Sequence, residues 1–93
     1  MKFEWDLAKN EINIKKHGVD FNDAKSVFFD EGARIIDDPD HSTSEDRFII
    51  VGVDYKFRTL LVCHCYRDED EVIRIISARK ATKAEVKSLG GEK

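Results

Sequence analysis

The chain has 93 residues, of which 41% are hydrophobic and 38% are charged, and its formal net charge is −3. This length predicts a single domain, residues 1–93, and the composition is typical of a globular protein with a densely ionic surface. Since no apolar run is long enough for a membrane helix and no signal-peptide pattern begins the chain, we expect a cytoplasmic protein without a membrane partner.

Charge is distributed unevenly along the chain. Residues 28–54 carry eight acidic and two basic side chains, whereas residues 72–93 carry six basic and two acidic ones. The negative total argues against non-specific binding of nucleic acid. The asymmetry is compatible with an anion at one face and a basic partner at another, and equally with a solvated surface of mixed charge.

The N-terminal quarter predicts a strand followed by a helix. Residues 3–5 alternate as a short strand, and Asp6 then stands where the N-cap of a helix over residues 7–17 is expected. Gly18 is the residue type that ends helices in the left-handed conformation. The apolar stripe expected to face the core consists of Leu7, Ala8, Ile12 and Ile14.

The middle of the chain predicts a helix, a strand and a loop. The helix opens at Asp20 or Asn22, ends near Gly32, and points Ala24, Val27 and Phe28 inward. Residues 33–36 resemble a short strand. Residues 37–46 form a polar loop rich in Asp and Ser around Pro39.

The C-terminal half predicts three strands and a helix. Strands over residues 47–53 and 59–67 form a hairpin, and residues 72–78 return as a central strand. Thr82 and Glu85 make a capping box for a helix over residues 83–89. The resulting order β-α-α-β-β-β-β-α predicts an α+β domain with a mainly antiparallel sheet.

Cations surround the last strand. Arg79 and Lys80 follow it directly, and Arg67 and Arg74 flank or occupy it. Arginine binds phosphate as a bidentate fork and lysine as a point charge, so a phosphate platform is one interpretation. The other is a set of sheet-edge charges paired with Glu69, Glu71 and Glu85. Strict alternation places Arg79 with Ile75 and Ser77 on one face, and Arg74 with Lys80 on the other.

Two histidine motifs have competing interpretations. Lys16 and His17 precede Gly18, where His17 can serve as a general acid or base, or simply offset the helix dipole. Cys63, His64 and Cys65 suggest a metal site, to which His41 could add a ligand from another part of the chain. Alternation in a strand separates His64 from the two cysteines, which favours buried apolar thiols and no metal or cofactor. The cysteines are too close in one strand for a good disulfide, which fits a reducing compartment.

Two separated stretches resemble the signatures of one family, the BrnT toxins of bacteria. The first comprises Phe3 to Asp6, Lys9, Asn13, Lys16 to Val19, Phe21 and Ala24, and the second runs from Ile73 to Thr82. Between them, the acidic loop that leads to Arg47 and Phe48, and then Gly52, also fits the family. The likeness covers nearly the whole chain.

The resemblance implies a small RelE-like fold and a ribonuclease toxin of a type II toxin–antitoxin system, without a cofactor. It implies metal-independent cleavage of RNA that inhibits translation, with the ribosome as a candidate partner. The expected antitoxin is of the BrnA type and contacts operator DNA, which the toxin reaches only through it. We expect catalysis by His17, Arg79 and Arg67, and RNA contacts by Lys16, Arg74, Lys80 and Lys83.

Two other functions remain open. The chain can be a non-catalytic module that holds an antitoxin and co-represses the operon, although the presence of His17 and Arg79 favours the enzyme. It can also be a free single-strand RNA binder, which requires exposed aromatic side chains for base stacking. Trp5, Phe21, Phe28 and Phe48 stand at core-like positions instead.

Overall fold

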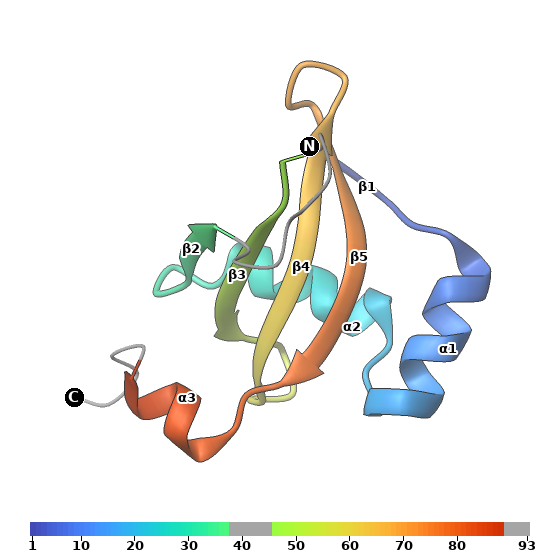
Figure 1. Ribbon diagram of the computed structural model, residues 1–93. Coiled ribbons are helices and arrows are strands. Elements are labelled where there is room, and N and C mark those ends of the chain that lie inside the picture. Colours follow the sequence, from blue (N-terminus) through green and yellow to red (C-terminus); the bar gives the residue numbers. More distant parts are fainter. Residues whose placement is uncertain (38–45, 89–93) are drawn as a thin grey trace.

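The computed structural model describes residues 1–37 and 46–88, and within them the chain forms a five-stranded sheet with helices packed against it (Figure 1). The strands are β1 (Lys2–Glu4), β2 (Arg34–Asp37), β3 (Phe48–Val53), β4 (Thr59–Arg67) and β5 (Val72–Lys80). The helices are α1 (Leu7–His17), α2 (Phe21–Ala24), the 3-10 helix η1 (Lys25–Phe29) and α3 (Lys83–Ser88).

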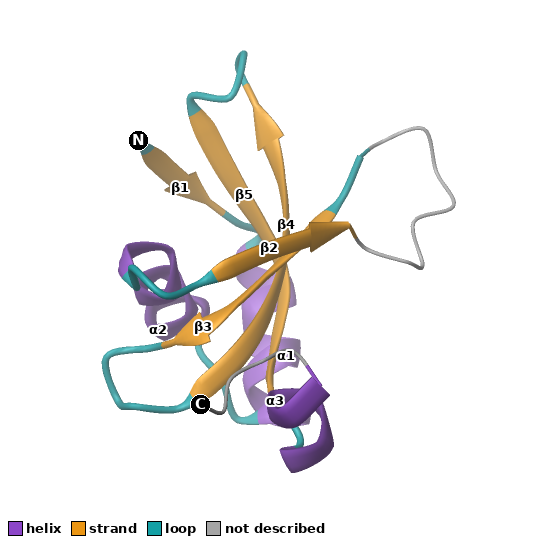
Figure 2. Cartoon of the chain, turned by 90° about the vertical axis from the view of Figure 1, so that its left-hand side faces the viewer, coloured by secondary structure: helices purple, strands orange, loops and turns teal. Residues whose placement is uncertain are grey.

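The strand order is β1-β5-β4-β3-β2, with β1 parallel to β5 and the other neighbours antiparallel. The predicted α+β class and mainly antiparallel sheet are therefore confirmed. The sheet twists, so that β2 runs across the direction of β4 and β5 in Figure 2. The predicted second helix is shorter than expected, since η1 ends at Phe29. Most of the predicted polar loop, residues 38–45, lies outside the described residues.

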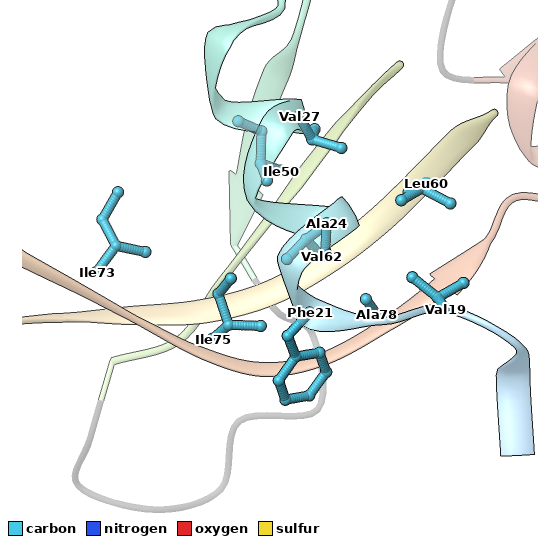
Figure 3. Close-up of a cluster of buried hydrophobic side chains, with 10 residues drawn as sticks. All are labelled: Val19, Phe21, Ala24, Val27, Ile50, Leu60, Val62, Ile73, Ile75 and Ala78. Carbon is cyan, nitrogen blue, oxygen red and sulfur yellow. The ribbon is translucent and has the colours of Figure 1, made fainter. Parts of the chain in front are cut away.

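Buried hydrophobic side chains form the core between the sheet and the segment from Val19 to Val27 (Figure 3). Phe21 and Val27 come from the helical side, and Leu60, Val62 and Ile75 from the two central strands. Each such side chain contributes about 1.5–3 kcal/mol through removal from water. We call the opposite side of the sheet the distal face; Leu61, Cys63 and Cys65 of β4 point to it, because they alternate with the core residues.

Local signals in the sequence determine where α1 begins and ends. The Asp6 side chain accepts a hydrogen bond from the Lys9 N–H at 3.1 Å, and Gly18 adopts a left-handed φ of 71°. Its N–H donates to the Ile14 carbonyl at 2.8 Å, which satisfies a carbonyl of the last turn. The predicted limits of this helix, residues 7–17, are confirmed.

The predicted inner face of α1 is wrong. Leu7 is 76% exposed and Ile12 is 62% exposed, whereas Asn13 is only 5% exposed. The physical reason is that α1 lies beside the free edge of β5, where unpaired main-chain groups need hydrogen-bond partners. An amide side chain meets that need, and an aliphatic one does not.

Gly52 of β3 occupies a place where a side chain does not fit. A Cβ there would lie 2.8 Å from the Ala33 Cβ and 2.9 Å from Asp30 Oδ2. The same Asp30 oxygen accepts a hydrogen bond from the Val53 N–H at 2.8 Å. The close approach of the loop over residues 30–33 to β3 therefore depends on glycine at position 52.

Among the described residues, no helix is long and apolar enough to cross a membrane.

Candidate active site

A β-bulge decides which cations share a face of the sheet. Arg74 pairs with Cys65 and Arg79 with Leu61, and a register shift lies between these pairs, beside Cys63 and His64. Antiparallel partners point to the same face, so Arg74 and Arg79 both lie on the distal face. The alternation-based prediction that separated them is wrong, because the irregularity adds one residue to β5.

Arg67 also lies on the distal face, but far from Arg79. It follows Leu61, the partner of Arg79, by six positions along β4, which at about 3.3 Å per residue is roughly 20 Å. The Arg67 and Arg74 guanidinium groups instead share the Glu4 carboxylate of β1, at 3.8 and 2.9 Å. The three arginines thus form two groups at opposite ends of one face.

His17 and Arg79 line one cavity of about 250 Å³. The cavity lies where the end of α1 meets the distal face near the end of β5. Ile49 and Leu61 provide apolar surface, while Cys63 and Ser77 provide polar atoms beside the His17 and Arg79 side chains. The remaining lining residue is Ala78. The structure therefore brings together an imidazole and a guanidinium from sequence positions 62 residues apart.

Asn13 ties the helix that carries His17 to the strand that carries Arg79. Its Nδ2 donates to the carbonyls of Ala78, at 2.8 Å, and Val19, at 2.9 Å. Its Oδ1 accepts from the Ala78 N–H at 3.1 Å. Asn13 precedes His17 by one helical turn, and Ala78 precedes Arg79 by one residue. The contact thus sets the spacing between the two candidates.

Arg79 forms a bidentate ion pair with Glu85 of α3. The Nη1–Oε1 distance is 2.9 Å and the Nη2–Oε2 distance is 2.7 Å. The Arg79 hydrogen bonds, and then the Thr82 N–H, lower the pKa of Glu85 from its ordinary 4.5 to about 2. Of the three carboxylates that the sequence offers as alternative partners of the cations, Glu85 is therefore a real partner.

The lysines among the sequence candidates are exposed and lie outside the cavity lining. Lys16 is in the last turn of α1, and Lys83 is the first residue of α3. Lys80 pairs with Leu60 and so belongs to the core-facing side at the end of β5. These positions are open to solvent and leave their ammonium groups accessible to an anion.

His64 belongs to the core. Its ring lies 4.8 Å from the Phe28 ring and 5.2 Å from the Tyr66 ring, and it has no exposed surface. Since the Val62 carbonyl can only accept, Nδ1 donates to it, at 3.0 Å, and Nε2 accepts from the Tyr66 hydroxyl. Burial lowers the pKa of His64, partly opposed by the Val62 hydrogen bond. Among the described residues, no three His, Cys, Asp or Glu side chains are grouped to hold a metal, and His41 lies outside them.

Three residues that shape the cavity are not apparent as such from the sequence. Asn13 stands out there only as part of a family signature, although a polar residue on the inner side of a helix is itself a signal. The sequence identifies Glu85 as part of the capping box of α3, but no local pattern in the sequence predicts its ion pair with Arg79. Ser77 shares the face of Arg79, as alternation predicts, but only the tertiary fold brings His17 and Ile49 to that face to form a cavity.

Comparison with known proteins identifies the family. A family model described as "Ribonuclease toxin, BrnT, of type II toxin-antitoxin system" matches residues 5–85. Among solved structures, the chain is similar to the crystal structure of the Brucella abortus ribonuclease toxin BrnT, at 26% identity and a TM-score of 0.68. The match covers 89% of this chain and 99% of that one. No curated protein sequence matches the chain. The chain therefore belongs to the BrnT family of ribonuclease toxins of type II toxin–antitoxin systems.

Proposed function

We propose that the protein is a metal-independent endoribonuclease in which His17 and Arg79 act on the same phosphate of RNA. The observation that carries this proposal is that both side chains line one cavity. Family membership supports RNA as the substrate. An imidazole near neutrality can move protons in either direction, and a guanidinium can stabilise a charged phosphorane.

The reaction begins when a base removes the proton of a ribose 2′-OH and the 2′-oxygen attacks the adjacent phosphorus. The bond to the 5′-oxygen breaks, an acid returns a proton to that oxygen, and a cyclic phosphate is left. We assign one of the proton transfers to His17 and the stabilisation of the phosphorane to Arg79. General acid–base action contributes about 10²–10⁴-fold, and one charge-stabilising donor about 10²–10³-fold.

Arg67 has a different role in this proposal from the catalytic one that the sequence suggested. At roughly 20 Å from the strand position of Arg79, it reaches a different phosphate of an extended RNA. Arg74 belongs with it, since both contact Glu4. Lys16, Lys80 and Lys83 supply exposed positive charge closer to the cavity. These residues strengthen RNA binding and its dependence on salt.

The family implies an antitoxin partner, and we propose that it is a DNA-binding protein of the BrnA type. Contact with operator DNA then occurs through the antitoxin, which agrees with the negative net charge of this chain. The ribosome is a further candidate partner, because it can present RNA to a toxin that has little excess positive charge of its own.

The test is cleavage of a labelled RNA in EDTA by the wild type, His17→Ala, Arg79→Ala and Arg67→Ala. We expect cutting by the wild type, a loss of at least about 10²-fold in His17→Ala and Arg79→Ala, and a smaller loss in Arg67→Ala. Equal cutting by wild type and Arg79→Ala would place the site elsewhere. Metal-dependent cutting would contradict the mechanism.

One observation favours a second function, a non-catalytic module that holds the antitoxin and co-represses the operon. Arg79 and Arg74 are both neutralised by carboxylates of the same chain, as in a structural ion pair. This alternative predicts that the wild type cuts neither free RNA nor RNA on ribosomes, while still binding its antitoxin.

A further inference from the structure

We propose that Glu85 is a positioning residue that holds the Arg79 guanidinium at the cavity, which makes α3 a part of the active site. This inference rests on the proposed function, since it assigns to Arg79 the stabilisation of the reacting phosphate. It explains why a short helix with an exposed surface is joined to the sheet by a bidentate ion pair.

The hydrogen bonds of Arg79 leave two adjacent N–H groups of its guanidinium available to a ligand. Nη1 donates to Glu85 Oε1 and to the Lys80 carbonyl, and Nη2 donates to Glu85 Oε2. A guanidinium has five N–H donors, so Nε–H and the second proton of Nη2 have no acceptor among the described residues. These two protons lie on the same side of the planar group. They form the pair that binds a phosphate in bidentate fashion.

Glu85 is itself held in place by the start of α3. Its Oε1 accepts from the Thr82 N–H at 3.0 Å, and its own N–H donates to Thr82 Oγ1 at 3.1 Å. The carboxylate that orients Arg79 is therefore part of a capping box and cannot rotate without breaking the helix start. An arginine oriented in advance loses less conformational freedom when the transition state forms.

The opposite role for Glu85 makes a different prediction. If its carboxylate only masked Arg79, removal of Glu85 would free the guanidinium and speed cleavage. A positioning role predicts slower chemistry even though the removal of a negative charge favours the approach of RNA. The two roles therefore differ in the sign of the change in kcat.

The first experiment compares Glu85→Gln and Glu85→Ala with Glu69→Ala, which removes an exposed carboxylate from the turn at the far end of β4 and β5. Glutamine can keep the capping box and one hydrogen bond to Arg79, but not the bidentate pair. We expect kcat to fall about 10-fold to 10²-fold in Glu85→Ala and less in Glu85→Gln, with KM unchanged or lower. Faster cleavage by either Glu85 variant would overturn the proposal, as would an equal loss in Glu69→Ala.

A second measurement separates this inference from the proposed function. The NMR relaxation of the Arg79 side-chain Nε–H reports the mobility of the guanidinium without RNA. We expect a rigid group in the wild type and in Glu69→Ala, and a mobile one in Glu85→Ala. An equally rigid Arg79 in Glu85→Ala would overturn the positioning role, whatever the activity. If the wild type cleaves no RNA but Arg79 becomes mobile in Glu85→Ala, the proposed function fails. The positioning of Arg79 by Glu85 is then still supported.

Discussion

Asn13 and Ala78 are joined by hydrogen bonds in both directions, from Nδ2 to the Ala78 carbonyl at 2.8 Å and from the Ala78 N–H to Oδ1 at 3.1 Å. The amide side chain therefore pairs with β5 as the main chain of another strand would. Strand β1 pairs only with residues 72–74 of β5, so the rest of this edge has no neighbouring strand among the described residues. The contact with Asn13 satisfies main-chain groups of that open edge and attaches α1 to it. It also determines where His17 lies relative to Arg79.

Replacement of Asn13 tests that attachment. Asn13→Ala leaves buried groups of Ala78 and Val19 without partners, and each such group costs about 1–3 kcal/mol. We expect the free energy of unfolding to fall by at least about 2 kcal/mol, measured by denaturant titration. Asn13→Asp keeps the shape of the side chain but cannot donate hydrogen bonds to the two carbonyls, so it should be no more stable than Asn13→Ala. Asn22→Ala, at an exposed position, should change stability by less than about 0.5 kcal/mol. Equal stability of Asn13→Ala and wild type would contradict this account.

Gly52→Ala tests the close approach of the Asp30–Ala33 loop to β3. A Cβ at position 52 meets the Ala33 Cβ at 2.8 Å, and that atom cannot move without its backbone. We expect a loss of about 1–3 kcal/mol in the free energy of unfolding. Gly32→Ala is the matched control, since its nearest contact is an ordinary 3.7 Å. Thermal unfolding of both variants should separate them, and equal behaviour would rule out steric crowding at Gly52.

His64 should make stability depend on pH. Because burial lowers its pKa in the folded state below the ordinary 6.5, the unfolded chain binds a proton first as pH falls. Stability therefore decreases as pH falls below about 6.5 and rises with pH through the same window. Denaturant midpoints measured across this window should slope in the wild type and in His17→Gln, and flatten in His64→Phe. An unchanged slope in His64→Phe would assign the effect to other groups.

The Glu85 carboxyl should titrate with a pKa of about 2 in the wild type and move back toward 4.5 in Arg79→Ala. Its lowered pKa contributes stability that is present above pH 4.5 and is lost as the pH falls toward 2. Side-chain NMR of Glu85 during acid titration measures this shift directly. A value that stays near 2 without Arg79 would mean that the Thr82 N–H alone holds the carboxylate.

Arg67 and Arg79 should differ in kinetics, because they lie at opposite ends of the distal face. Arg67→Ala should raise KM, leave kcat nearly unchanged, and reduce the slope of log affinity against log salt by about 0.7 for one lost phosphate contact. Arg79→Ala should mainly lower kcat. Cleavage measured over a range of salt concentrations distinguishes them, and a large loss of kcat in Arg67→Ala would refute the assigned roles.

Local signals are enough to predict most elements of the fold. The limits of α1 depend on Asp6 and Gly18, and the start of α3 on Thr82 and Glu85, all of which act within one turn of helix. The hairpin of β3 and β4 follows from two apolar runs that are neighbours along the chain. The family signatures are likewise continuous stretches of sequence, so the amino-acid sequence by itself is enough to identify the family.

Only the tertiary structure determines which of the candidate residues lie close together. Whether Arg74 and Arg79 share a face depends on a register shift between β4 and β5, which no alternation pattern within β5 reveals. The inward position of Asn13, and with it the meeting of His17 and Arg79, depends on main-chain groups of Ala78 that are 65 residues away. Hydrophobic periodicity describes which face of a helix avoids water. It does not describe which face must supply hydrogen bonds to the edge of a sheet.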